Sequence, residues 1–258
     1  MGRKKSLRDH LIVETDSKPD WKIVRDAMEP TKARHNESHA HKHEESVKEP
    51  KPKALEAKTE NQKIYIKTIR ECTVTFCSGV AGTGKTYIAC GIGAQMLMDN
   101  KINRIIISRP IVECGHRLGF LPGDLHEKTD PYMNPMFESL SDFIEPCKLK
   151  KLLTDKVIES VPLETMRGRT FHNALMILDE AQNVTKTQMK MFLTRMGKDS
   201  KVVICGDINQ SDLTHQDVNP LRWAMALLDH QQIGHVVLTE ADIQRNGLIG
   251  YILKALGN

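Results

Sequence analysis

The stretch Gly79-Val-Ala-Gly-Thr-Gly-Lys-Thr86 decides the fold of this chain. It matches the pattern G-x-x-x-x-G-K-[ST] in full, after the apolar run Cys72–Cys77 and at the start of a helical pattern over Lys85–Met98. Its glycines let the backbone curl with its N–H groups pointing inward, beside the positive end of a helix. The stretch therefore predicts a P-loop, a site for nucleotide phosphates.

The residue types in this loop suggest separate roles. Lys85 is expected to reach the β and γ phosphates of ATP, and Thr86 to offer its hydroxyl to Mg²⁺. Gln62, upstream of the first strand, could hydrogen-bond the adenine edge through its two-sided amide. Together with Gln62, the predicted nucleotide-binding residues are Gly79, Val80, Ala81, Gly82, Thr83, Gly84, Lys85, Thr86 and Tyr87.

A pair of carboxylates follows a second apolar run, Ala174–Leu178. Open α/β sheets bind ligands at the carboxyl ends of their strands, so Asp179 is expected to hold Mg²⁺ as a Walker B aspartate does. Glu180 is placed to polarise the attacking water. This adjacent carboxylate favours ATP hydrolysis and argues against a small-molecule kinase.

A third strand end carries Gly206-Asp207-Ile-Asn-Gln210, after the apolar run Lys201–Cys205. Its spacing resembles motif III of superfamily 1 helicases. We expect the amide of Gln210 to sense the γ phosphate or its water, which makes it a predicted catalytic residue.

Along the rest of the chain, short apolar runs alternate with segments whose apolar residues recur at helical spacing. Because near-continuous apolar strands separated by helices are typical of a parallel sheet covered on both faces, we predict an α/β fold. The segment from Ser108 to Asp130 is either a functional loop or a structural excursion packed on the core. The predicted strands are Cys72–Cys77, Arg104–Ser108, Lys156–Val161, Ala174–Leu178, Lys201–Cys205 and His235–Leu238, and the predicted helices are Lys85–Met98, 186–196 and Leu221–Leu228.

Composition narrows the class of protein. The 258 residues carry 37 Lys+Arg and 33 Asp+Glu, which excludes a highly basic coat protein but not a nucleic-acid binder with a local basic rim. No apolar run approaches the roughly 20 residues of a membrane span, and no secretory signal follows the basic start. Six cysteines without a Cys-x-x-Cys pair favour buried thiols over disulfides or zinc. We predict a cytoplasmic protein with no membrane partner.

Residues 1–56 are predicted to be a partly disordered appendage and charged linker, ahead of an ATPase domain over 57–258. The first 60 residues hold 14 Lys+Arg and 12 Asp+Glu, too polar a stretch to bury a core. Four histidines in it, His35, His39, His41 and His43, fit either a solvated polar tract or a metal site.

The sum of these motifs resembles the PhoH-like family of P-loop ATPases, named for phosphate-starvation induction. The resemblance implies a RecA-like core, a ring-like homo-oligomer of six copies, and helicase activity directed at RNA or single-stranded nucleic acid. His116 and Asn246 depart from the residues usual in the family, which leaves their roles open. The residues that carry the resemblance are Asn61-Gln62-x-x-Tyr65, the P-loop, Ser108-Arg109-Pro110, Leu118–Leu125, Met166–Thr170, Leu178–Asn183, Gly206-Asp207 with Gln210, and Asp242–Arg245.

One RecA-like core supplies no second domain to complete its ATP site. An arginine that neutralises the transition state must then come from elsewhere in the core or from a neighbouring copy. Arg245 is the leading candidate, followed by Arg169 and Arg195, although Arg245 could instead be a surface residue paired with Asp242. The alternative to a nucleic-acid motor is an ATP-switched binding or scaffold protein.

Overall fold

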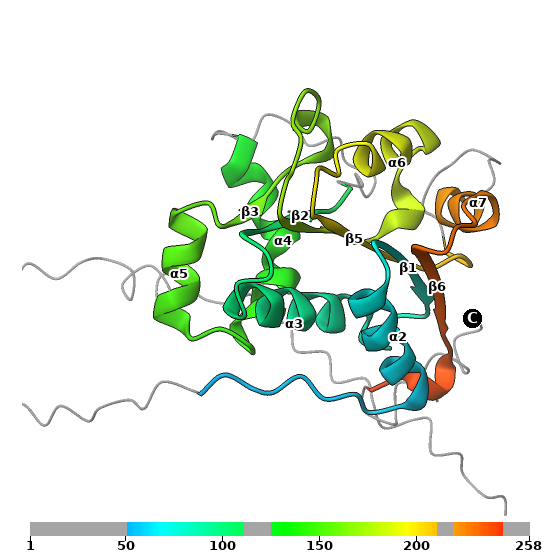
Figure 1. The fold of residues 1–258 in the computed structure, drawn as a ribbon, viewed down its shortest axis with the longest axis horizontal. Coiled ribbons are helices and arrows are strands. Elements are labelled where there is room, and N and C mark those ends of the chain that lie inside the picture. Colours follow the sequence, from blue (N-terminus) through cyan, green and yellow to red (C-terminus); the bar gives the residue numbers. More distant parts are fainter. Residues whose placement is uncertain (1–50, 111–124, 211–218, 245–258) are drawn as a thin grey trace, which may run out of the picture. The chain divides into compact units, whose positions relative to one another are not determined.

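The computed structural model describes residues 51–110, 125–210 and 219–244, with only the backbone described at 125–132. Within these residues a six-stranded sheet has the order β3-β2-β4-β5-β1-β6, and every paired strand is parallel (Figure 1). This confirms the predicted α/β class. The strands are β1 (Val74–Gly79), β2 (Arg104–Ser108), β3 (Ile158–Ser160), β4 (Ala174–Leu178), β5 (Lys201–Gly206) and β6 (Ile233–Leu238).

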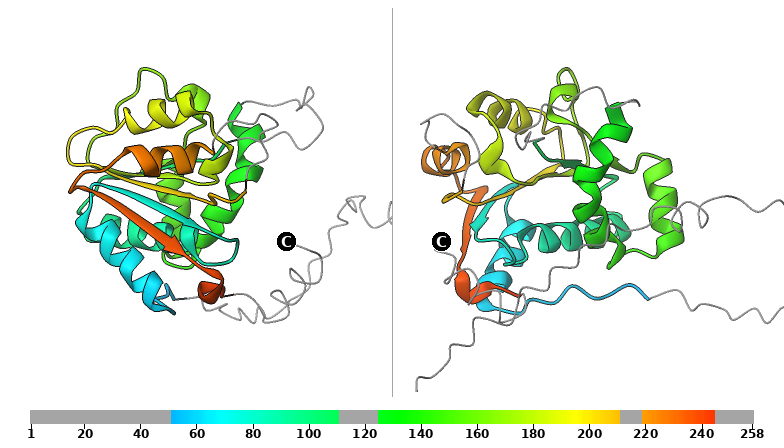
Figure 2. Two further views of the ribbon diagram at one scale, coloured as in Figure 1. Left: turned by 90° about the vertical axis from the view of Figure 1, so that its right-hand side faces the viewer. Right: turned by 180° about the vertical axis from the view of Figure 1, so that it is seen from behind.

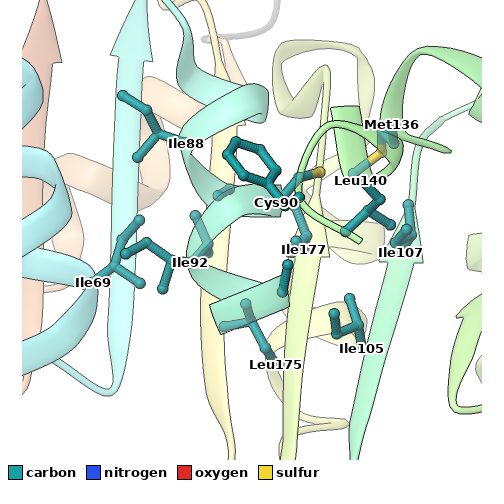
Figure 3. Close-up of a cluster of buried hydrophobic side chains, with 14 of the residues drawn as sticks. Ile69, Ile88, Cys90, Ile92, Ile105, Ile107, Met136, Leu140, Leu175 and Ile177 are labelled. Carbon is teal, nitrogen blue, oxygen red and sulfur yellow. The ribbon is translucent and has the colours of Figure 1, made fainter. Parts of the chain in front are cut away.

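Helices cover both faces of the sheet, as the left view of Figure 2 shows. Four pack with one face in a single apolar cluster, and two pack with the other face in a second cluster. Figure 3 shows part of the first cluster, in which Ile92 of α3 lies toward Ile69 of α2 and Cys90 of α3 lies beside Ile177 of β4. Van der Waals packing in this cluster holds the helix that follows the P-loop on the sheet. The four are α2 (Glu60–Glu71), α3 (Lys85–Met98), α4 (Leu125–Ser141) and α5 (Pro146–Thr154), and the two are α6 (Lys186–Leu193) and α7 (Pro220–Leu227).

The strand register brings the predicted site together. Ser78 of β1 pairs with Gly206 of β5, and Ser108 of β2 pairs with Leu178 of β4. The carboxyl ends of these four strands therefore meet at one edge of the sheet. β5 lies between the P-loop strand and the strand that ends before Asp179.

Several predicted bounds need correction. The third strand is shorter than predicted because Lys156 has a φ of 54°, a left-handed conformation that an extended strand does not contain. The last strand begins two residues earlier, at Ile233. The segment from Ser108 to Asp130 is not one loop, since α4 begins at Leu125; residues 111–124 lie outside the described residues.

The end of the predicted linker lies on the core. Leu55 packs against the cluster around α3, and Lys53 forms an ion pair with Asp142 at 2.9 Å. Residues 1–50, with the four histidines, lie outside the described residues. Among the helices that the structure describes, none is both long and apolar enough to cross a bilayer.

Cys77, Cys90 and Cys205 are free thiols, buried in the sheet and in α3. Burial raises the pKa of Cys205 to about 12, so this thiol stays protonated at neutral pH. Within the described ranges no group of three or more His, Cys, Asp or Glu is arranged to hold a metal ion.

Candidate nucleotide site

The P-loop lies between β1 and α3 and borders a cavity of about 380 Å³. Gly84 immediately precedes the helix with a φ of 87°, a conformation that a side chain would strain. The cavity also receives side chains that follow β2, β4 and β5, as expected for the carboxyl edge of a parallel sheet.

Lys85 is folded back onto its own loop. Its Nζ donates to the carbonyl oxygens of Gly79, at 2.6 Å, and Val80, at 3.0 Å. These partners are neutral, so phosphate oxygens would be stronger acceptors for the same ammonium group.

Thr86 and Asp179 meet where the P-loop helix faces the end of β4. The Thr86 hydroxyl donates to Asp179 Oδ1 over 2.7 Å. The pKa of Asp179 is raised above its ordinary value, first by burial and then by the charge of Glu180. The hydrogen bond from Thr86 and the charge of Arg109 oppose this rise without cancelling it. A hydroxyl and a carboxylate side by side in the cavity that the P-loop borders are hard oxygen donors, so these residues fit Mg²⁺.

Glu180 follows Asp179 in a left-handed backbone conformation, with φ 50° and ψ 41°. Its Oε1 accepts a hydrogen bond from Arg109 Nη2 at 3.1 Å, and its Oε2 accepts one from Gln182 Nε2 at 2.6 Å. The carboxylate thus lies in the cavity wall with a donor on each oxygen.

Sequence reasoning gave no catalytic role to Arg109 or Gln182. Arg109 follows β2 directly, and the β4 backbone reaches that point because Asp179 N donates to Ser108 O at 2.9 Å. The rule that selected Asp179, a polar residue directly after an apolar strand, would also have selected Arg109. Gln182 carries no comparable signal in the sequence.

Gln210, in the segment that follows β5, lines the cavity. The side-chain amide of Asn219 holds this segment, because its Nδ2 donates to the backbone carbonyl of Gln210 at 2.8 Å and to that of Asp207 at 3.1 Å. Asp207 is buried, and its Oδ2 has no hydrogen-bond partner among the described residues, which leaves one more acceptor at this edge.

Gln62 is buried behind the P-loop, not exposed toward open space. Its Nε2 donates to the Thr83 carbonyl at 2.9 Å, and its Oε1 accepts from Lys58 N at 2.7 Å. Both ends of the amide are therefore used by backbone groups, and its contact with adenine stays a prediction. Tyr87 lines the cavity, and its hydroxyl donates to Asp142 Oδ2 at 3.2 Å.

Residues 54–257 match the sequence profile described as PhoH-like protein. The chain belongs to the PhoH-like family. It is 46% identical over 202 residues to a PhoH-like protein of Synechocystis, covering 78% of this chain and 62% of that one. It is 39% identical over 202 residues to Protein PhoH of Escherichia coli, covering 77% of this chain and 57% of that one. The chain thus spans about three fifths of the length of these relatives.

The fold is also similar to that of a solved phage protein. The large terminase of a thermophilic bacteriophage superposes with a TM-score of 0.51 at 10% identity, over 77% of this chain and 50% of the terminase. At this identity the likeness concerns the fold alone, and it agrees with the predicted RecA-like core.

Two segments that carry the PhoH-like resemblance, about 180 residues apart, meet beside the P-loop. The buried carboxylate of Asp242 accepts hydrogen bonds from the Thr59 hydroxyl, from Asn61 Nδ2 at 2.9 Å and from Thr239 N at 2.7 Å. Gln244 N then donates to the Gly82 carbonyl at 3.0 Å. The carboxyl-terminal segment is thereby fixed to the phosphate loop as far as residue 244.

The predicted arginines are not brought into the cavity by the described part of the chain. Arg245 follows Gln244 but lies outside the described residues, as do His116 and Asn246. Arg169 forms a two-bond ion pair with Glu159, at 2.9 and 2.7 Å, and lies over the ring of Phe171. Neither Arg169 nor Arg195 lines the cavity.

Proposed function

We propose that this PhoH-like chain is a Mg²⁺-dependent ATPase that acts, as a homo-oligomer, on RNA or single-stranded nucleic acid. The observation that carries the proposal is the convergence of Lys85, the Thr86–Asp179 pair and Glu180 on one cavity. The nucleic-acid partner and a ring of six copies rest on the family resemblance. The segment Gly206–Gln210 is similar in spacing to a helicase motif and lines this cavity, which supports the proposal of a nucleic-acid partner.

Different residues of the chain carry out separate parts of the proposed ATP hydrolysis. The P-loop N–H groups and Lys85 bind the phosphates, and Glu180 takes a proton from the attacking water. The water oxygen bonds to the γ phosphorus as the bond to the β–γ bridging oxygen breaks, and ADP leaves with that electron pair beside inorganic phosphate. Thr86 and Asp179 would hold Mg²⁺, which when bound supplies positive charge to the phosphate oxygens.

Two substitutions test the assignment in one assay of ATP binding and turnover. Lys85→Ala should weaken nucleotide binding, whereas Glu180→Gln should bind ATP and lose turnover by roughly 10²–10⁴-fold. Glu71→Gln, at the exposed end of α2, is the matched control and should change neither. Turnover at the wild-type rate in Glu180→Gln would show that Glu180 is not the base.

Adding RNA or single-stranded DNA to the same assay separates the two classes of function. A nucleic-acid motor should hydrolyse ATP faster when its substrate is present. Turnover that responds to neither polymer would contradict the motor and favour an ATP-switched binding protein.

A further inference from the structure

Arg109 is the only arginine that lines the nucleotide cavity among the described residues. It directly follows β2, whose carboxyl end lies beside that of β4. Its Nη2 donates to Glu180 Oε1 at 3.1 Å, and about a quarter of its side chain is exposed to solvent. The forked, positively charged guanidinium group of Arg109 thus faces both the proposed base, Glu180, and the space where we propose that the phosphates bind.

Glu180 is held independently of Arg109. Gln182 is buried, and its Oε1 accepts from the backbone N–H of Asp207 at 3.0 Å. Since that N–H can only donate, the amide must present its oxygen there, and its NH₂ end must face Glu180 Oε2. If Arg109 left, Glu180 would keep its hydrogen bond to Gln182 and its position in the cavity wall.

The terminal phosphate of ATP would compete for Arg109. It carries more negative charge and more acceptor oxygens than a carboxylate, and a guanidinium binds phosphate oxygens in pairs. The Glu180 carboxylate is also more than one-third exposed, which weakens its hold on the arginine.

We propose that Arg109 exchanges Glu180 for the terminal phosphate of ATP and is the arginine that neutralises the transition state within its own chain. The exchange couples two events, since the contact with phosphate leaves Oε1 of Glu180 open to the attacking water. Arg109 is then a catalytic residue, and Gln182 positions Glu180 during the exchange. The inference rests on the proposed ATPase function.

ADP lacks the phosphate that Arg109 would contact, so nucleotide discrimination tests the proposal. Arg109→Ala should weaken binding of a non-hydrolysable ATP analogue roughly tenfold while leaving ADP affinity within about twofold. Turnover should fall by about 10³-fold or more. Arg109→Lys, which keeps the charge but loses the fork, should recover part of the analogue affinity. Arg104→Ala, at the exposed amino end of the same strand, is the matched control and should change none of these values.

A double-mutant cycle then tests the exchange itself. Glu180→Gln removes the charge that competes for Arg109, so it should tighten binding of the ATP analogue several-fold, and only where Arg109 is present. Equal tightening in the Arg109→Ala background would overturn the exchange. Equal loss of analogue and ADP affinity in Arg109→Ala, or loss of neither, would overturn the phosphate contact.

The wild-type protein separates these failures from a failure of the proposed function. If it neither binds nor hydrolyses ATP, the function itself is wrong. If it does both, and Arg109→Ala retains the wild-type ratio of analogue to ADP affinity, the inference about Arg109 alone is wrong. Retained ADP affinity also reports that each variant is folded.

Discussion

Gln182 donates from Nε2 to Glu180 Oε2 across 2.6 Å, and through its other end it joins the carboxyl ends of β4 and β5. The contact depends on Gly206, because a Cβ at that position would lie 2.6 Å from Gln182 Oε1. Since the loop after β5 also carries Gln210, the proposed base and the proposed phosphate sensor belong to one hydrogen-bonded unit. Movement of one loop would therefore displace the other.

We expect Gln182→Glu to lower ATP turnover by about 10²-fold with little change in nucleotide affinity. The new carboxylate can still accept from Asp207 N, but it repels Glu180 and cannot donate to it. Gln182→Met keeps the length of the side chain without the charge and should cost less turnover. Steady-state ATPase assays and nucleotide titration make the comparison, and wild-type turnover in Gln182→Glu would remove the positioning role.

Asp242 should stabilise the fold in a pH-dependent way. Burial alone would raise the pKa of Asp242, but hydrogen bonds from Thr59, Asn61 and Thr239 outweigh it and lower the pKa. A lowered carboxyl pKa contributes stability that is fully present above the unfolded value of about 3.9 and is lost as the pH falls through the folded value.

Asp242→Asn should accordingly lower the free energy of unfolding by roughly 1–3 kcal/mol at pH 7, because its NH₂ group would face other donors. The difference in free energy of unfolding between the variant and the wild type should become smaller as the pH falls below about 4. Urea unfolding at several pH values measures it, with Glu240→Gln, an exposed neighbour, as the control. A gap that is the same at every pH would contradict a charged Asp242.

The sequence predicted the parts of the site that follow a single rule. Polar residues in the segments that follow apolar strands share one edge of a parallel sheet, and this rule predicts that Asp179, Glu180 and Gln210 lie beside the P-loop. Long-range partners escaped that rule, because Gln182 reaches Glu180 through a backbone group of the next strand. Asp242 likewise meets Asn61 only after the whole domain has folded.

Helix α4 shows a different limit. It runs through Pro131 and Pro135, residues that disfavour a helix interior, although Met133, Met136 and Leu140 follow the i, i+3, i+7 spacing of an amphipathic helix. Met133, Met136 and Leu140 nevertheless have no solvent exposure, because they complete the cluster against α3 and β2. Burial of this apolar face outweighs the unfavourable helix propensity of the two prolines, which mask the periodic pattern in the sequence.

Binding of single-stranded nucleic acid should weaken steeply with salt. Aromatic residues make up 5% of the chain, so contacts from Lys and Arg to phosphates are expected to exceed base stacking. If about four phosphates are neutralised, affinity should fall by about fiftyfold between 50 and 200 mM salt. Fluorescence anisotropy with a labelled single-stranded RNA measures the slope, and an affinity that stays constant over this range would exclude the electrostatic interpretation.

Mixing two inactive variants distinguishes an arginine that acts within its own chain from one supplied by a neighbouring copy. With Arg109 and Glu180 in the same site, every site of an Arg109→Ala and Glu180→Gln mixture lacks one of the two, so turnover should stay low. An arginine supplied by the neighbour, as predicted for Arg245, behaves differently. If Arg245 filled that role instead, some interfaces of an Arg245→Ala and Glu180→Gln mixture would combine an intact Glu180 with an intact Arg245, and turnover would partly return. Recovery in the first mixture would contradict action of Arg109 within its own chain, and no recovery in the second would exclude Arg245 as a shared residue.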